Sequence, residues 1–316
     1  MNKDLVDVNL LRISIVQYLN TAPLVRGFTH GPLRGKYELS FTVPSQCAEA
    51  LRTGTADVAI IPAIEYERIP DLVVLPGLSI ASSRTVRSLL LVTRKPMGEA
   101  RRVALDRGSR STQTLVRILC DGLWKTTPGY FEADPNLPEM LQDADAALLI
   151  GDPALKLSIA CAPVGRREAD GAWVVPAGAA GLAGDAPVRI YDVVEQWRAL
   201  TGRPAVMAVW AARKQVVKPE LVRDFQDSLA FGLRHLDAIA NEAAVELQLP
   251  AAELRRYLTE NIDYRLDGEH RDALLLFYQL AAKLGRIEAV KTIAFAAEAG
   301  GPGRYMDVIS KSRAGN

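Results

Sequence analysis

Short apolar runs alternate with helix-like segments along the first half of the chain, and this order restricts the fold more than any other feature. A first set of runs has the length and apolar content of buried strands: RISIVQ (12–17), YELSFTV (37–43) and DVAII (57–61). Each precedes a segment with helical spacing, and the order repeats at 102–106, 129–133 and 145–150. Strands that alternate with helices form parallel sheets with helices on their faces. The sequence therefore predicts an α/β protein with two lobes, each a doubly wound, mostly parallel sheet.

The two lobes are predicted to be discontinuous in sequence. A long apolar strand, VRSLLLVTRKP (86–96), joins the two sets of strands, and a strand at 204–213 leads into C-terminal helices. Lobe one is expected to comprise residues 1–92 plus 214–316, and lobe two residues 93–213, with hinges near these boundaries. A ligand cleft is expected between the lobes. Further expectations are a helix at 188–202, a loop at 165–187 and a loosely held tail at 300–316.

Composition argues against several classes of function. The 316 residues are 49% hydrophobic, enough for a sizeable core, and 38 Lys and Arg balance 37 Asp and Glu. That balance gives no electrostatic reason to expect binding to nucleic acid or to a membrane surface. Three cysteines without a C-x-x-C pair predict no metal or redox site and are typical of buried thiols in a reducing compartment. The N-terminal residues lack the features of a signal peptide, so a cytoplasmic protein is expected.

Polar side chains follow the predicted strands at the ends that would face the cleft. Hydroxyl and amide groups beside a helix N-terminus, with its free N–H groups, suit a carboxylate or a phosphate. Because such groups occur in both lobes, a ligand with more than one anionic group is expected. The candidates in lobe one and on the joining strand are Asn20, Thr21, Ser45, Arg87 and Ser88. Those in lobe two are Ser109, Arg110, Ser111, Thr112, Gly151 and Asp152.

A structural interpretation of these residues competes with the functional one. Ser, Thr and Asn at helix starts usually serve only as caps, and Asp152 is more often an N-cap than a catalyst. The sequence contains no Ser-His-Asp order, H-E-x-x-H motif, P-loop or dinucleotide-binding motif. The residues by themselves thus predict a two-lobed binder of a small anion. It is either a passive receptor or an enzyme whose reaction needs little acid–base help.

Six segments, in order from about residue 11 to residue 285, resemble the chorismate dehydratases of the futalosine route to menaquinone. They are YLNTAPL, FTVPSQCAEALRTGTADVAIIPAIEY, VRSLLLVTR, LDRGSRSTQTLVRIL, AALLIGDPAL and WRALTGRPAVMAVWAAR. The resemblance implies a periplasmic-binding-protein type II-like fold, used as a cytoplasmic enzyme. It also implies the conversion of chorismate to 3-[(1-carboxyvinyl)oxy]benzoate and water, the reaction of a carbon–oxygen lyase, with no cofactor.

The resemblance also implies roles for the candidate residues. Asn20 is expected to hydrogen-bond the reacting region of the substrate ring, assisted by Ser88. Ser45 and Arg87 are candidates for holding one substrate carboxylate. The base is left open between the substrate's own enolpyruvyl carboxylate and Asp152. The family often has Ser-Arg-Thr-Ser where this chain has Ser-Arg-Ser-Thr, which keeps two hydroxyls. This segment supplies the residues expected to hold the other carboxylate: Ser109, Ser111 and Thr112.

Three other functions compete with this one. The sister enzyme, 1,4-dihydroxy-6-naphthoate synthase, shares the implied fold, but an Asp-containing motif is expected there in place of YLNTAPL. A non-catalytic receptor for a small aromatic acid would have to leave the cytoplasm, and a LysR-like effector domain would need a DNA-binding helix-turn-helix. The expected partner is one dianionic small molecule, and the oligomeric state stays open between monomer and homodimer.

Overall fold

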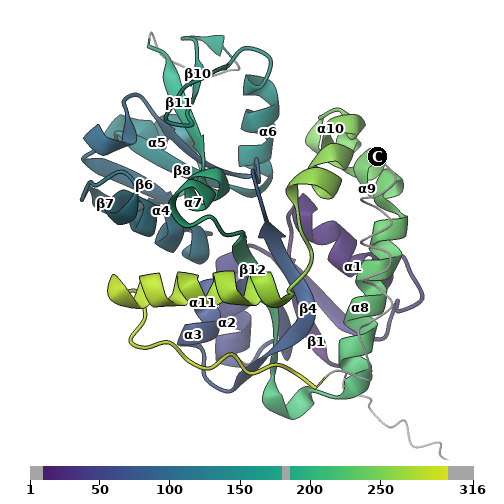
Figure 1. Cartoon of the computed structure of the whole chain (residues 1–316). Helices are drawn as coiled ribbons and strands as arrows, with labels where there is room; N and C mark the ends of the chain where they lie inside the picture. Colours follow the sequence, from purple (N-terminus) through teal and green to yellow (C-terminus); the bar gives the residue numbers. More distant parts are fainter. Residues whose placement is uncertain (1–9, 180–185, 298–316) are drawn as a thin grey trace, which may run out of the picture.

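Two β-sheets form the frame of the molecule, one in each lobe (Figure 1). The computed structural model describes residues 10–179 and 186–297. The sheet of lobe one has the order β2-β1-β3-β12-β4, with strands Glu38–Thr42, Arg12–Val16, Val58–Pro62, Ala205–Arg213 and Leu72–Ser82. The sheet of lobe two has the order β7-β6-β8-β5-β11-β10-β9, with strands Gly129–Ala133, Arg102–Asp106, Ala146–Ile150, Leu89–Thr93, Val188–Asp192, Trp173–Val175 and Arg166–Arg167. The predicted pair of α/β lobes is confirmed.

Both sheets are mixed rather than mostly parallel. The strands that alternate with helices are parallel, as expected: β1 pairs with β2 and β3, and β6 pairs with β7 and β8. The strands that enter from the other lobe run the opposite way. In lobe one β12 is antiparallel to β3 and β4, and in lobe two β5 is antiparallel to β8 and β11. The prediction missed this because it did not assign the joining strands to a sheet.

Sheet membership also locates the two crossings between lobes. The strand β5 belongs to the sheet of lobe two, and β12 belongs to the sheet of lobe one. The chain therefore crosses at residues 83–88 and at residues 202–204, whereas the expected boundaries are 92 and 213. Each joining strand pairs with the sheet that it enters, so the crossing lies before the strand and not after it.

Three segments differ from the sequence prediction, and one of them is the expected loop at 165–187, which contains β9 and β10. The eleven-residue strand β4 is fully buried, yet it was not predicted. Its Pro76 and Gly77 interrupt the apolar pattern, and its register with β12 shifts at two irregular points. The expected helix at 188–202 is instead β11 followed by α7 (Val193–Thr201). Asp192 ends the strand and caps the helix, because its carboxylate accepts from the backbone N–H groups of Val194 and Glu195.

Helices cover both sheets (Figure 1). In the first part of lobe one they are α1 (Ala22–Thr29), α2 (Pro44–Thr53) and α3 (Ala63–Arg68). Lobe two has α4 (Arg110–Gly122), α5 (Leu137–Asp143), α6 (Gly151–Cys161) and α7. The predicted C-terminal helices are α8 (Pro219–Arg234), α9 (Leu236–Leu247), α10 (Ala251–Arg256) and α11 (Gly268–Lys283). The last of these contacts both β12 and α4, and so lies against both lobes.

Helix α8 packs on α1 at very short range. A Cβ atom on Gly232 would stand 1.9 Å from the carbonyl oxygen of Pro23, so only glycine fits at this crossing. The segment after Arg286, for which the sequence predicted no role, lies along lobe one, where Phe295 bridges to Val74 of β4. The predicted tail at 300–316 lies outside the described residues.

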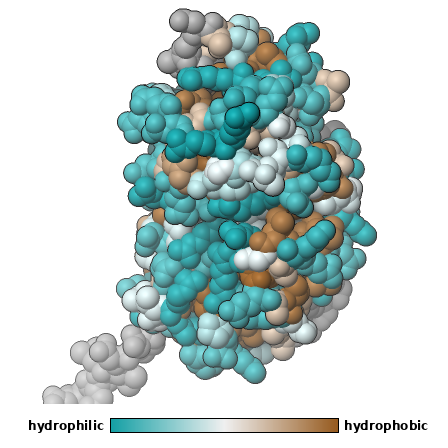
Figure 2. Space-filling model, turned by 90° about the vertical axis from the view of Figure 1, so that its left-hand side faces the viewer, coloured by the Kyte–Doolittle hydropathy of each residue, from teal (hydrophilic) through white to brown (hydrophobic). Residues whose placement is uncertain are grey.

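A polar surface encloses the core. Figure 2 shows one face on which hydrophilic residues predominate and hydrophobic ones gather in the lower half. The expected buried thiols are confirmed, since all three cysteines are free and buried. In the described part of the chain, no helix is long and apolar enough to cross a membrane.

Candidate active site

The predicted ligand site is a small cavity where the two lobes meet. Its volume is about 60 Å³, far below the roughly 300–1,000 Å³ of pockets that hold small molecules. Apolar side chains from several strands form part of its wall. It brings together six residues that the sequence singled out: Asn20, Thr21, Ser109, Ser111, Thr112 and Gly151. A ligand as large as an aromatic acid therefore requires the lobes to separate before it enters.

Two contacts between the lobes close the cavity on the side of the short 3₁₀ helix η1 (Leu19–Thr21). The Tyr18 ring lies so close to Gly151 that a Cβ atom on this glycine would stand 2.6 Å from ring carbons. The carboxylate of Asp152 accepts a hydrogen bond from the backbone N–H of Leu19 at 3.1 Å. Both contacts thus connect lobe one, which contributes Tyr18 and Leu19, to lobe two, which contributes Gly151 and Asp152.

The loop between β6 and α4 forms the wall on the side of lobe two. Ser109 is the residue before α4, and its hydroxyl makes no capping bond to the helix. Together with the free N–H groups of the helix, Ser109 and Thr112 form a donor set suited to a carboxylate. The Ser111 hydroxyl is already engaged, because it accepts from the backbone N–H of Ile64 at 3.1 Å and so caps α3 of the other lobe. Ser45 is not among the described residues that line the cavity.

A chain of hydrogen bonds forms the wall on the side of lobe one. The Thr21 hydroxyl donates to Asn20 Oδ1 at 3.2 Å, and the phenol of Tyr257 donates to Ser88 Oγ at 2.8 Å. The Asn20 side chain lies near the phenol and lowers its pKa, against the larger effect of burial. The backbone carbonyl of Ser88 accepts from Gly151 N–H at 2.8 Å. Ser88 itself is buried and is not among the described residues that line the cavity.

The comparison with known families is decisive for the classification. Residues 11–283 match the family model described as menaquinone biosynthesis. The chain belongs to this family. It is similar to the chorismate dehydratase of Thermus thermophilus, with 28% identity over 268 residues that span 84% of this chain and 93% of the relative.

Solved structures share the fold of this menaquinone biosynthesis protein. A protein from Archaeoglobus fulgidus matches with a TM-score of 0.64 and 15% identity, over 89% of this chain and 100% of that chain. The periplasmic aliphatic sulphonate binding protein from Escherichia coli matches with a TM-score of 0.60 and 15% identity, over 93% of this chain and 94% of that chain. The predicted periplasmic-binding-protein-like fold is confirmed.

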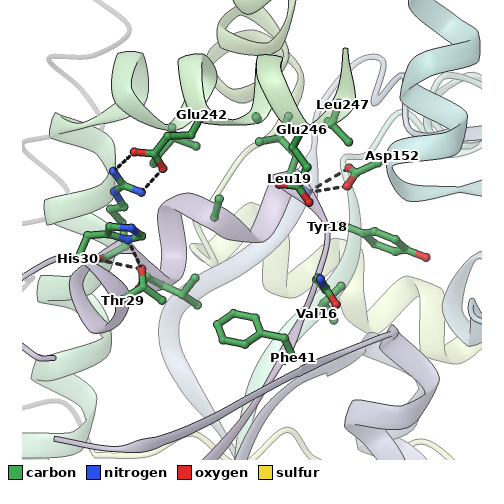
Figure 3. Close-up of a pocket in the computed structure, with 16 residues that line it drawn as sticks. Val16, Tyr18, Leu19, Thr29, His30, Phe41, Asp152, Glu242, Glu246 and Leu247 are labelled. Atoms are coloured by element: carbon green, nitrogen blue, oxygen red, sulfur yellow. Dashed lines mark hydrogen bonds and ion pairs between the residues drawn. The ribbon is translucent and has the colours of Figure 1, made fainter. Parts of the chain in front are cut away.

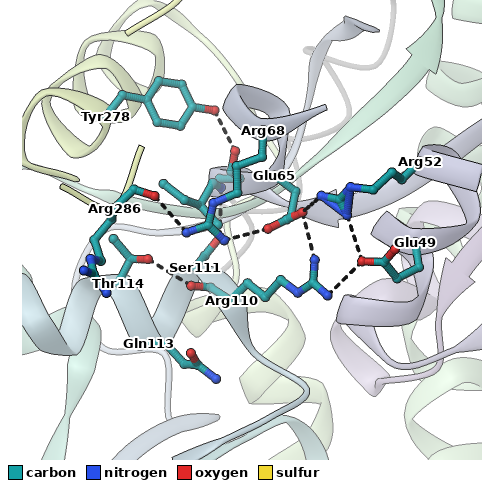
Figure 4. A network of polar contacts seen from close by, with 12 residues as sticks. Glu49, Arg52, Glu65, Arg68, Arg110, Ser111, Gln113, Thr114, Tyr278 and Arg286 are labelled. Atoms are coloured by element: carbon teal, nitrogen blue, oxygen red, sulfur yellow. Dashed lines mark hydrogen bonds and ion pairs between the residues drawn. The ribbon is translucent and has the colours of Figure 1, made fainter. Parts of the chain in front are cut away.

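Arg110 lies in an ion-pair network between the lobes of this family member and not in the cavity (Figure 4). Its guanidinium donates to Glu65 at 3.0 Å and to Glu49 at 2.9 Å, both in lobe one. Glu65 is completely buried and also pairs with Arg52 and Arg68. The Arg110 side chain thus connects the two lobes, and it is not among the described residues that line the cavity.

Arg87 also points away from the cavity. Its guanidinium pairs with Glu253 of α10 at 3.0 Å and lies 3.4 Å from the Ser158 hydroxyl of α6. It lines a different pocket, of about 660 Å³. Its backbone has a φ of +62°, which non-glycine residues adopt at a cost. Asp192 stabilises this turn by accepting from Arg87 N–H at 2.7 Å, and burial raises the pKa of Asp192 to about 7.

Asp152 lines a third pocket, on the outer side of η1, of about 320 Å³ (Figure 3). Burial raises the pKa of Asp152 to about 6, against the lowering effect of the hydrogen bond from Leu19. Glu246 of α9 lies on the same pocket and raises this pKa further. The carboxylate thus serves as a contact between lobes, and it is not among the described residues of the inter-lobe cavity.

One buried carboxylate at the site was not predicted. Asp106 ends β6 and is 2% exposed; its Oδ1 accepts from Gly108 N–H at 2.8 Å. Its Oδ2 has no hydrogen-bond partner among the described residues, and burial raises the pKa of this group. Asp106 holds the turn that carries Ser109. The described residues contain no group of three or more His, Cys, Asp or Glu side chains arranged to hold a metal ion.

Proposed function

We propose that this protein is a chorismate dehydratase, which converts chorismate to 3-[(1-carboxyvinyl)oxy]benzoate and water. Membership of the menaquinone biosynthesis family and the similarity to the Thermus thermophilus enzyme support this function. The observation that carries it is the cavity itself, where uncharged hydrogen-bond donors from both lobes meet and the described lining residues include no Asp, Glu or His. The substrate is a metabolic intermediate, so we place the reaction in the cytoplasm.

The proposed reaction suits such a cavity. Chorismate is a dianion with a ring hydroxyl, and the reaction breaks the bond from the ring carbon to this hydroxyl. The C–H bond on the adjacent, ether-bearing carbon also breaks, and the proton and hydroxide leave together as water. Because the ring becomes aromatic, catalysis needs mainly orientation, exclusion of water and hydrogen bonds to the departing hydroxyl.

Each wall of the cavity has a distinct part in this proposal. Ser109 and Thr112, at the N-terminus of α4, would hold one carboxylate in lobe two. Asn20 and Ser88 would hydrogen-bond the departing hydroxyl from lobe one. Asp152 is bonded to a backbone N–H and faces a different pocket. Its position favours the substrate's own enolpyruvyl carboxylate as the base.

The test is to incubate the purified protein with chorismate alone and to follow the products by chromatography with mass detection. A product lighter by one water and aromatic in its absorbance is expected from the wild type. Asn20→Ala is expected to abolish it, whereas Asn241→Ala, an exposed residue of α9, serves as the matched control with unchanged activity. Chorismate recovered intact from the wild type would overturn the proposal. Tight binding without turnover would then indicate a receptor, and the absence of binding would point to the sister synthase.

A further inference from the structure

We propose that Tyr257 is a positioning residue for this reaction, which fixes the direction in which Ser88 donates its hydrogen bond. The inference rests on the proposed function, and it adds a residue to the site that the sequence motifs did not indicate. Tyr257 lies 169 positions from Ser88 in the chain, yet their hydroxyl oxygens are 2.8 Å apart.

The polarity of the chain of hydrogen bonds carries the argument. A phenol has one proton, and Tyr257 gives it to Ser88 Oγ. The proton of Ser88 must then point to another acceptor. The neighbours of Ser88 on this wall, Leu89 and Gly151, both line the inter-lobe cavity. Ser88 is itself buried beside them, and the proposal assigns a substrate oxygen in the cavity as this acceptor.

Asn20 is oriented by its neighbour in the chain. Its Oδ1 accepts from the Thr21 hydroxyl at 3.2 Å, and its amide N–H groups are its donors. The Asn20 side chain lies near the Tyr257 phenol and lowers its pKa, against the larger effect of burial. Asn20 is therefore a neighbour of the Tyr257–Ser88 pair, and the role proposed for Tyr257 acts through Ser88.

The backbone around Tyr257 is built to hold the phenol in place. Residues Tyr257–Asn261 form a π-helical turn after α10, a form that is often found at functional sites. From the same turn, Asn261 Nδ2 donates to the carbonyl and to the hydroxyl of Thr85, each at 3.1 Å. The turn thus contacts the crossing segment 83–88 at two residues, Thr85 and Ser88. Burial is the largest cause of the raised pKa of Tyr257, so the phenol stays protonated and acts as a donor.

The experiment is a double-mutant cycle with Tyr257→Phe, Ser88→Ala and the double variant, assayed on chorismate. Tyr257→Phe removes one oxygen atom, and we expect kcat to fall about tenfold with little change in KM, as expected for the loss of one hydrogen bond. In the Ser88→Ala background the same change should lower kcat by less than about twofold, since Tyr257 acts through Ser88. The matched control is Tyr278→Phe, another fully buried tyrosine, whose hydroxyl donates to the Ala63 carbonyl at 2.8 Å. It should lower stability without lowering kcat.

A loss of kcat from Tyr257→Phe that is equally large in both backgrounds would overturn the proposal, because Tyr257 would then act independently of Ser88. An unchanged kcat would overturn it as well. Thermal unfolding of the four proteins gives a readout independent of turnover. If the wild type does not consume chorismate, the proposed function fails. The positioning role is then tested by the melting temperatures of the four proteins. A change in the double variant that differs from the sum of the changes for Tyr257→Phe and Ser88→Ala supports it, and a change equal to that sum refutes it.

Discussion

Gly151→Ala should impair closure of the lobes more than it impairs folding. The backbone at Gly151 has a φ of +68°, which costs about 1–2 kcal/mol for a residue with a Cβ atom. The new methyl group would also stand 2.6 Å from the ring of Tyr18 in the other lobe. Forcing such an overlap costs about 1–3 kcal/mol. The strain of the positive φ lowers the stability of the folded state whether or not the lobes are in contact. The overlap with the ring destabilises only the form in which Tyr18 contacts residue 151.

The free-energy cost of the overlap, about 1–3 kcal/mol, corresponds to a loss of about 5- to 150-fold in kcat/KM. Steady-state kinetics of Gly151→Ala on chorismate measures this loss. Gly35→Ala is the matched control, because Gly35 has a φ of +75° and nothing within 4 Å of the position of a Cβ atom. It should lower the melting temperature without lowering kcat/KM. Equal kcat/KM values for the two variants would refute the argument, since closure of Tyr18 onto residue 151 would then have no part in turnover.

Two further predictions concern contacts between the lobes. The pKa of Asp152, raised to about 6 from 3.8, means that the folded protein binds this proton more tightly than the unfolded chain does. Its contribution to stability is greatest below about pH 4 and is lost as the pH rises through about 6. The melting temperature of Asp152→Asn should therefore rise relative to that of wild type as the pH increases from 4 to 7. A difference in melting temperature that does not change with pH would contradict this. Arg110→Ala should lower the free energy of unfolding by about 1–2 kcal/mol in urea titrations, because it removes charged hydrogen bonds to Glu49 and Glu65. Arg255→Ala, which loses only an exposed pair, should change it by less than about 0.5 kcal/mol.

The sequence predicted the cavity better than it predicted the outer parts of the site. Residues that follow strands, such as Asn20, Ser109 and Gly151, meet as expected, because the carboxyl ends of neighbouring parallel strands share one edge of a sheet. Long side chains did not follow this rule. Arg87 and Arg110 start beside the cavity, but their guanidinium groups extend to Glu253 and Glu65. A strand pattern gives the position of a backbone, and it does not give the direction of a long side chain.

Tyr257 could not be predicted because no strand-end pattern marks it. It comes from the C-terminal helices, and only the packing of α10 beside the crossing segment brings it to Ser88. The strand β4 was missed for a local reason, since Pro76 and Gly77 break its apolar run. The two features that the prediction missed, Tyr257 and β4, lie close to each other in the structure. The β4 strand leads into the crossing segment, and the segment after the Tyr257 turn pairs with β4 where Asp263 bridges to Ala81.

A fold shared with binding proteins can become an enzyme through the direction of a few hydrogen bonds. A receptor needs donors that hold the anion as it is, and the N-terminus of α4 with Ser109 and Thr112 suits that task in either kind of protein. Catalysis needs donors that interact more strongly with the departing group than with the bound substrate. Under the proposed function such donors are Asn20 and Ser88 on the opposite wall, where the Tyr257 phenol donates to Ser88 Oγ. Under the proposed function, removing hydroxyls at α4 should therefore raise KM, whereas changes on the Tyr257 wall should lower kcat. If substitutions on both walls raise KM and leave kcat unchanged, the cavity binds its ligand without favouring the reaction.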